Sequence, residues 1–165
     1  MKFKQFTIIA MLFISFSAFS QNDYKAASEG WLVSIEDAYV QSQKTGKPIM
    51  ANFTGSDWCG WCKKLVRDVF SKPEFKKWAD KNVVLLELDF PRSFQIPEEI
   101  QQQNASLQQA FGVRGYPTVW VFYLDKDAAA SNFNIAALGK TGYMGSVADF
   151  TNSVNQMIEQ YKNQQ

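Results

Sequence analysis

Short apolar runs along the chain predict the strands of a buried sheet. Residues 83–90 and 118–124 are almost continuously apolar, which is typical of strands in the middle of a sheet. Residues 48–53 predict a shorter buried strand, and residues 134–143 predict an edge strand with a glycine-containing bend. The pattern therefore predicts a sheet whose two longest runs are central.

Apolar residues at helical spacing predict helices between and after these strands. A serine followed three residues later by an aspartate predicts a capped helix start at Ser34 and another at Ser146. Further helices are predicted to start at Cys59, Pro73 and Pro97. This alternation of strands and helices predicts an α/β protein with a central mixed sheet and helices on both faces.

The first 20 residues have the pattern of a secretory signal peptide. Lys2 and Lys4 precede an apolar run over residues 6–16, and residues 18–20 place small side chains at the cleavage-determining positions. The alternative is an uncleaved anchor, but the run is shorter than the roughly 20 residues of a spanning helix. We therefore expect a signal peptide over residues 1–20, one mature domain over residues 21–165, and a periplasmic location.

The charge balance gives no indication of a nucleic-acid partner. The chain of 165 residues has 17 Lys and Arg against 16 Asp and Glu. Loss of Lys2 and Lys4 with the signal peptide would leave 15 basic residues against 16 acidic ones, a net charge of −1. A basic binding surface is not expected from these counts.

Cys59 and Cys62 are the only cysteines of the chain, and their spacing is CxxC. Two cysteines cannot fill a structural zinc site, and the chain has no histidine to complete one. A purely structural disulfide would close so short a loop that it would constrain the unfolded chain very little. A redox-active dithiol and a soft-metal clip for Cu(I) remain as interpretations.

The predicted position of the pair favours redox chemistry. Cys59 falls at a predicted helix N-terminus, where backbone N–H groups and the helix dipole stabilise a thiolate. Cys62 lies three residues later on the same helix face, close enough to form a disulfide with Cys59. Cys59 is therefore the predicted nucleophile, and Cys62 the residue that resolves the mixed disulfide.

Two segments together resemble the thioredoxin family. They are residues 52–63, which contain Trp58-Cys59-Gly60-Trp61-Cys62, and residues 112–118, which contain Tyr116-Pro117. The second segment is similar to the corresponding loop of protein disulfide isomerase domains. Residues 54–58 and 83–90 resemble exported bacterial thioredoxin-like oxidoreductases, including a chlamydial periplasmic type.

The resemblance implies a thioredoxin fold and a set of site residues. It implies a cis Tyr116–Pro117 bond next to the cysteines, with the Tyr116 main chain pairing with substrate as an added strand. It also implies contacts to substrate from Trp58 and from the intervening Gly60 and Trp61. No cofactor and no metal are implied.

Two departures from the family pattern bear on mechanism. The buried carboxylate that the family commonly places before the active site is replaced by Asn52 or, in another alignment, Phe53. Its usual lysine partner corresponds to Leu85. Glu87 is a candidate substitute base, although we expect a partly exposed, salt-bridging residue there. Trp61 is neither the proline of reducing thioredoxins nor the histidine of isomerase and oxidase branches, so it cannot stabilise a thiolate by charge.

These observations predict a periplasmic thiol–disulfide oxidoreductase that acts on protein disulfides and receives electrons from a membrane or periplasmic donor. Reductase or isomerase activity is favoured over oxidase activity. The alternative is a Cu(I)-binding thiol chaperone on the same fold. No methionine or histidine ligand lies beside the cysteines in the sequence, although Met50 and Met144 could approach them in the fold. A non-catalytic binding module is disfavoured by the intact cysteine pair. The long segment from 89 to 117 predicts either a docking surface or a solvated helix.

Overall fold

The computed structural model describes residues 24–126 and 133–164. It contains a four-stranded mixed sheet in the order β2-β1-β3-β4, in which β1 is parallel to β2 and antiparallel to β3, and β3 is antiparallel to β4. The strands are β1 (Ile49–Thr54), β2 (Val84–Asp89), β3 (Thr118–Lys126) and β4 (Phe133–Thr141). The predicted α/β class with a mixed sheet is confirmed.

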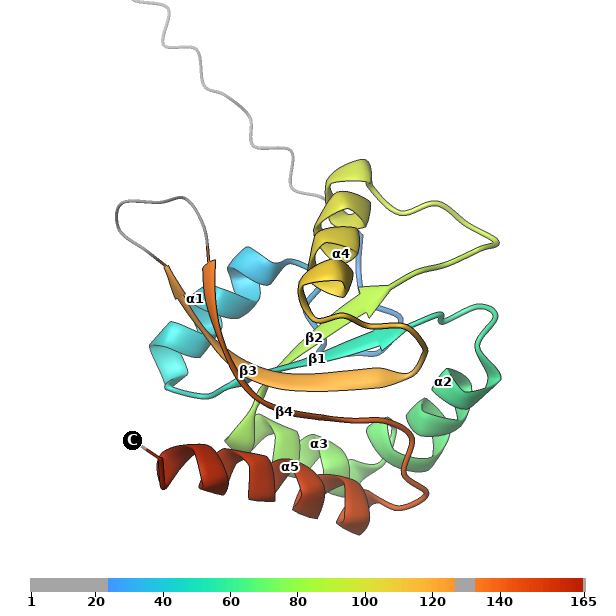
Figure 1. Cartoon of the computed structure of the whole chain (residues 1–165). Helices are drawn as coiled ribbons and strands as arrows, with labels where there is room; N and C mark the ends of the chain where they lie inside the picture. The colour runs from blue at the N-terminus through green and yellow to red at the C-terminus, as the bar shows by residue number, and fades with distance from the viewer. Residues whose placement is uncertain (1–23, 127–132, 165) are drawn as a thin grey trace, which may run out of the picture.

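Helices cover both faces of this sheet (Figure 1). Figure 1 shows α1 and α4 above the sheet, α3 and α5 below it, and α2 at the end where β1 leads into it. A π-helical segment, η1, continues α2 directly. The bounds are α1 (Ile35–Thr45), α2 (Gly60–Leu65), η1 (Val66–Phe70), α3 (Pro73–Asn82), α4 (Glu98–Ala110) and α5 (Val147–Lys162).

The two predicted serine caps are confirmed. The Ser34 hydroxyl accepts a hydrogen bond from the Asp37 N–H at 3.2 Å, and the Ser146 hydroxyl accepts one from the Asp149 N–H at 3.1 Å. Each bond satisfies an N–H group that has no partner within its own helix. Local sequence therefore determines where α1 and α5 begin.

The prediction that residues 83–90 form a central strand is wrong, because β2 lies at the edge of the sheet. Its outer edge is covered by the chain before α1: the Leu32 N–H donates to the Leu85 carbonyl at 2.9 Å, and the Glu87 N–H donates to the Leu32 carbonyl at 2.8 Å. Helices also cover both faces of the strand, so it is as apolar as a central one.

The strand predicted at 118–124 extends to Lys126. Pairing with β4 continues to the Lys126–Phe133 pair, and this explains the extra length. The predicted signal peptide lies outside the described residues. Among residues 24–126 and 133–164, no helix is both long and apolar enough to span a membrane.

One face of β1 and β2 changes from apolar to polar along its length. Met50 and Leu85 lie opposite each other and contribute to the core between the sheet and helices α3 and α5. Alternation then places four buried polar side chains on the same face, nearer the end of β1 that leads to α2. They form the facing pairs Asn52–Glu87 and Thr54–Asp89.

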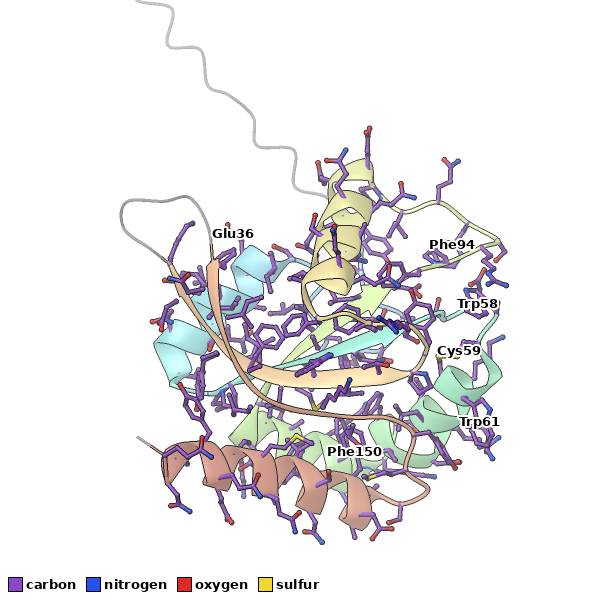
Figure 2. All side chains as sticks on the ribbon, in the orientation of Figure 1. Glu36, Trp58, Cys59, Trp61, Phe94 and Phe150 are labelled. Carbon is purple, nitrogen blue, oxygen red and sulfur yellow. A yellow bond between two sulfur atoms is a disulfide. The ribbon has the colours of Figure 1, made fainter. Side chains whose placement is uncertain are left out.

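The apolar part of this face is closed by Phe150 of α5. Its side chain is fully buried, and its ring centroid lies 5.3 Å from that of Phe70 and 6.0 Å from that of Phe75 (Figure 2). This aromatic cluster joins η1, α3 and α5 beneath the sheet.

We predict that Phe150→Ala lowers the free energy of unfolding by about 3–5 kcal/mol, because it opens a cavity in this cluster. Urea denaturation followed by circular dichroism measures the change. Val40→Ala, at an exposed position on α1, is the control and should change stability by no more than about 0.5 kcal/mol. A loss at Phe150 as small as that of the control would contradict the assigned packing.

Candidate active site

Cys59 and Cys62 form a disulfide at the start of α2, with their Cα atoms 5.2 Å apart. Cys59 is the N-cap of α2, and its Sγ accepts a hydrogen bond from the Cys62 N–H at 3.1 Å. Cys59 is 6% exposed and Cys62 is 2% exposed, so the outer sulfur belongs to the more accessible residue. The predicted helix-start position of Cys59 is confirmed, and its hydrogen bond would stabilise a thiolate there.

Trp58 is held in place on the outer side of the pair. Its indole N–H donates to the Phe90 carbonyl at 2.9 Å, and the Arg92 guanidinium lies 3.7 Å from the ring centroid. A Cβ on Gly55 would lie 2.5 Å from the indole, so this position requires glycine. The side chain is still 36% exposed, which leaves part of its surface free for contact.

Asp57 joins the turn before α2 to the segment after β2. Its carboxylate accepts from the Ser93 hydroxyl and the Ser93 N–H, each at 2.6 Å, and from the Arg92 N–H at 2.9 Å. The Ser93 side-chain hydrogen bond is the main reason that the pKa of Asp57 falls to about 2. The sequence alone predicted that Asp57 lies in a turn, but it did not indicate the distant partners Arg92 and Ser93.

The Tyr116–Pro117 bond is cis, as the resemblance implied. The Tyr116 ring stacks on Phe90 at 5.2 Å and meets the Trp58 ring edge-on at 5.8 Å, while its hydroxyl accepts from the Gln108 amide at 2.6 Å. The structure therefore brings this loop against Trp58, next to Cys59.

The two residues between the cysteines lie at the surface. A Cβ built on Gly60 would have no neighbour within 4 Å. Trp61 is 56% exposed, packs on Tyr143 at 5.1 Å and lies beneath the Lys64 ammonium, which is 4.6 Å from the ring. Figure 2 shows Trp58 and Trp61 on opposite sides of Cys59, so exposed aromatic surface flanks the pair.

Glu87 is buried, and the expectation of a partly exposed, salt-bridging residue is wrong. Its side chain is 3% exposed, and no salt bridge involves it in the part of the chain that the structure describes. Its carboxylate accepts from the Ala27 N–H at 2.6 Å. Burial raises the pKa of Glu87 to about 7, with a further upward contribution from the Asp89 charge.

The residue opposite Asn52 on β2 is Glu87, whereas Leu85 lies opposite Met50. The Asn52 Oδ1 atom is buried and has no hydrogen-bond partner. Asp89, one pair further along, accepts from the Ser56 N–H at 2.8 Å and from the Ser56 hydroxyl at 2.6 Å. Glu87 therefore faces Asn52, in the place where the resemblance implied Leu85.

Because the pKa of Glu87 rises from 4.5 to about 7 on folding, its protonated form stabilises the fold. That contribution is complete below pH 4.5 and is lost as the pH rises to about 7. We predict that the unfolding free energy of the disulfide form falls by about 3 kcal/mol across this window. Glu87→Gln, which keeps an acceptor for Ala27, should remove this contribution and be more stable than the native chain at pH 8.

Urea unfolding between pH 4 and pH 8 measures the effect. Glu36→Gln is a matched control: Glu36 is exposed in the first turn of α1 (Figure 2), and its carboxylate pairs there with the exposed Lys126 at 3.4 Å. Because an exposed pair contributes little to stability, this variant should still lose stability between pH 4 and pH 8 as the native chain does. A Glu87→Gln variant that loses stability with pH exactly as the native chain does would contradict a raised Glu87 pKa.

Comparisons with known proteins agree with this geometry. A model of the thioredoxin-like domain matches residues 35–157. The disulfide bond reductase DsbH of Chlamydia pneumoniae is 39% identical over 92 residues, which are 56% of this chain and 55% of that protein. The thioredoxin-related protein DsbJ of the same organism is 29% identical over 117 residues, 69% of this chain and 34% of that protein. The chain thus spans about half the length of the first relative and a third of the second.

Solved structures confirm the fold. A DsbH oxidoreductase superposes with a TM-score of 0.66 at 28% identity, over 84% of this chain and 94% of that chain. A thioredoxin from Thermus thermophilus, with a TM-score of 0.52 at 18% identity, shares the fold over 75% of this chain and 83% of its own. With its cysteine pair, its cis-proline loop and a family model that spans most of the described residues, the chain belongs to the thioredoxin-like family.

Proposed function

We propose that the protein is a thiol–disulfide oxidoreductase that acts on protein disulfides in the periplasm. The observation that carries the proposal is the Cys59–Cys62 disulfide at the start of α2, with the cis Tyr116–Pro117 loop beside it. The resemblance to proteins named disulfide bond reductase and thioredoxin-related protein supports the same reaction class. Export rests on the predicted signal peptide over residues 1–20.

In the reducing direction, the Cys59 thiolate attacks a substrate disulfide and forms a mixed disulfide, which releases one substrate thiolate. Cys62 then attacks the Cys59 sulfur, closes the Cys59–Cys62 disulfide and releases the second substrate thiolate. The exposure of the two residues supports this order, since Cys59 is the more accessible. A reduced dithiol on a membrane or periplasmic donor returns the pair to its starting state.

The substrate chain lies along the exposed surface around Cys59. Tyr116 pairs through its main chain with an extended substrate segment, and Pro117 keeps that backbone next to the cysteines. Trp58 and Trp61 supply apolar contact on the two sides of Cys59, and Gly60 leaves the space between them open. Aromatic surface of this kind binds many sequences, as an enzyme with varied protein substrates requires.

Reductase or isomerase activity is favoured over oxidase activity. A strong oxidant stabilises its reduced form by charge close to the thiolate, and Trp61 supplies none.

The alternative of a Cu(I) chaperone has less support. The described residues contain no group of three or more His, Cys, Asp and Glu that could hold a metal ion, and Met50 is fully buried in the core.

We predict that serine substitution stops the reaction at a different step for each cysteine. Cys59→Ser should abolish insulin reduction, because the nucleophile is lost. Cys62→Ser should accumulate a mixed disulfide between Cys59 and the substrate, because nothing resolves it. Insulin turbidity and mass spectrometry of acid-quenched samples measure the two effects. Full activity of Cys59→Ser would contradict the assigned nucleophile, and stoichiometric Cu(I) retention without dithiol turnover would support the metal function instead.

A further inference from the structure

Cys62 and Glu87 line the same small cavity beneath α2. The cavity has a volume of about 230 Å³ and is also lined by Thr54, Ser56 and the chain at Ala27. Cys62 comes from α2, and Glu87 comes from the polar face of β2. The inner cysteine and a buried carboxyl group therefore line one cavity that is large enough for water.

Among the residues that the structure describes, no cationic side chain forms a salt bridge with Glu87. Lys63 and Arg67 line the cavity, but the Lys63 ammonium donates to the Asp57 carbonyl at 2.8 Å and Arg67 pairs with Asp68 at 2.8 Å. Asp89 on β2 adds a like charge beside Glu87. Burial raises the pKa of Tyr24, in the N-terminal segment, to about 12, and the negative charges of Asp89 and Glu87 add to this shift. The Tyr24 phenol therefore stays neutral.

Asn52 places a neutral amide next to the Glu87 carboxyl group. It lies directly opposite Glu87 in the strand register, and its buried Oδ1 has no hydrogen-bond partner. The amide oxygen can accept from a protonated carboxyl, and the amide N–H can donate to a carboxylate. A neutral amide opposite Glu87 thus suits both protonation states, whereas a lysine would hold the carboxyl group ionised.

We propose that Glu87 takes the proton from the Cys62 thiol when Cys62 resolves the mixed disulfide at Cys59. The inference rests on the proposed function. The Cys62 S–H proton moves to the Glu87 carboxylate, directly or through a water in the cavity. The Cys62 thiolate then forms a bond to the Cys59 sulfur, and the bond between Cys59 and the substrate sulfur breaks. The two electrons leave with the substrate thiolate, and Glu87 later returns the proton to solvent.

The surroundings of Glu87 suit this role. A carboxyl group that titrates near neutral pH can accept a proton from a thiol and release it again at the same pH. The hydrogen bond from Ala27 holds the carboxylate in place at the cavity wall, and burial excludes bulk water as a competing acceptor. Stabilisation of the fold does not explain why Glu87 is buried here, because burying a carboxyl group without a counter-ion costs free energy.

Oxidised glutathione separates the two chemical steps. Attack by Cys59 releases one glutathione and leaves Cys59 glutathionylated, and resolution by Cys62 releases the second. We expect Glu87→Gln to form the glutathionylated species at the native rate and to resolve it about 100-fold more slowly at pH 8. In the native protein the resolution rate should rise with pH through an inflection near 7, and the variant should lack that inflection. Glu36→Gln should match the native protein in both steps.

Rapid acid quenching and mass spectrometry of the glutathionylated chain measure both rates. Resolution by Glu87→Gln at the native rate, with the native pH profile, would overturn the role of Glu87 while leaving the proposed function intact. A native protein that releases no glutathione and forms no glutathionylated species would instead contradict the proposed function itself.

A second measurement uses the native chain and does not depend on the folding of the variant. Carbon-13 NMR of the Glu87 carboxyl group follows its titration in the disulfide and the dithiol forms. The reduced pair adds thiolate charge beside the carboxyl group, so its titration midpoint should be higher in the dithiol form. Equal midpoints in the two forms would show that Glu87 and the cysteines are not coupled, and would overturn the inference.

Discussion

The active site depends on one constraint: four polar side chains are buried at the end of one face of the sheet, next to α2. Most of that face is apolar and packs against α3 and α5, but near the cysteines it is interrupted by buried polar side chains, namely Asn52, Thr54, Glu87 and Asp89. A buried carboxyl group costs free energy unless it is neutral or hydrogen-bonded. The fold tolerates Glu87 there because its protonated form is favoured and a backbone N–H holds its carboxylate. Burial of Glu87 lowers the stability of the fold at neutral pH, and it places a proton acceptor next to Cys62, as the proposed mechanism requires.

The outer side of the cysteine pair depends on a different set of contacts. Asp57 and Trp58 join the turn before α2 to the segment after β2, through hydrogen bonds to Arg92, Ser93 and Phe90. That segment leads to Phe94, whose side chain is exposed on the same side of the molecule as Trp58 (Figure 2). The long stretch between β2 and the cis-proline loop is therefore attached to the active-site turn, and it extends the exposed aromatic surface near Cys59.

Much of the fold could be predicted from local patterns. Apolar runs and serine caps located the strands and both capped helices, because those signals depend on residues close together in sequence. The edge position of β2 could not be predicted, since the segment at Leu32 that covers its outer edge carries no strand-like pattern of its own. Asp57 was missed as a supporting residue because its partners, Arg92 and Ser93, lie far along the chain. Gly55 was missed because its contact depends on the place of the Trp58 indole, which is fixed by the distant Phe90 carbonyl.

Glu87 shows where sequence interpretation reached its limit. The alternation of residues 85, 87 and 89 places a charged side chain on a defined face, but it does not say whether that face is covered. An exposed, paired glutamate is the more common outcome for such a residue, and this was the expectation. Only the path of the N-terminal segment, which brings Ala27 against the carboxyl group, buries it.

The central claim is that protonation of Glu87 and oxidation of the cysteine pair are coupled. The most direct test is the reduction potential of the Cys59–Cys62 couple, measured against pH in dithiol buffers for the native protein and for Glu87→Gln. If the reduced pair raises the pKa of Glu87, reduction takes up an additional proton near neutral pH, and the native potential falls more steeply with pH there than that of the variant. An identical pH dependence in the two proteins would contradict the account.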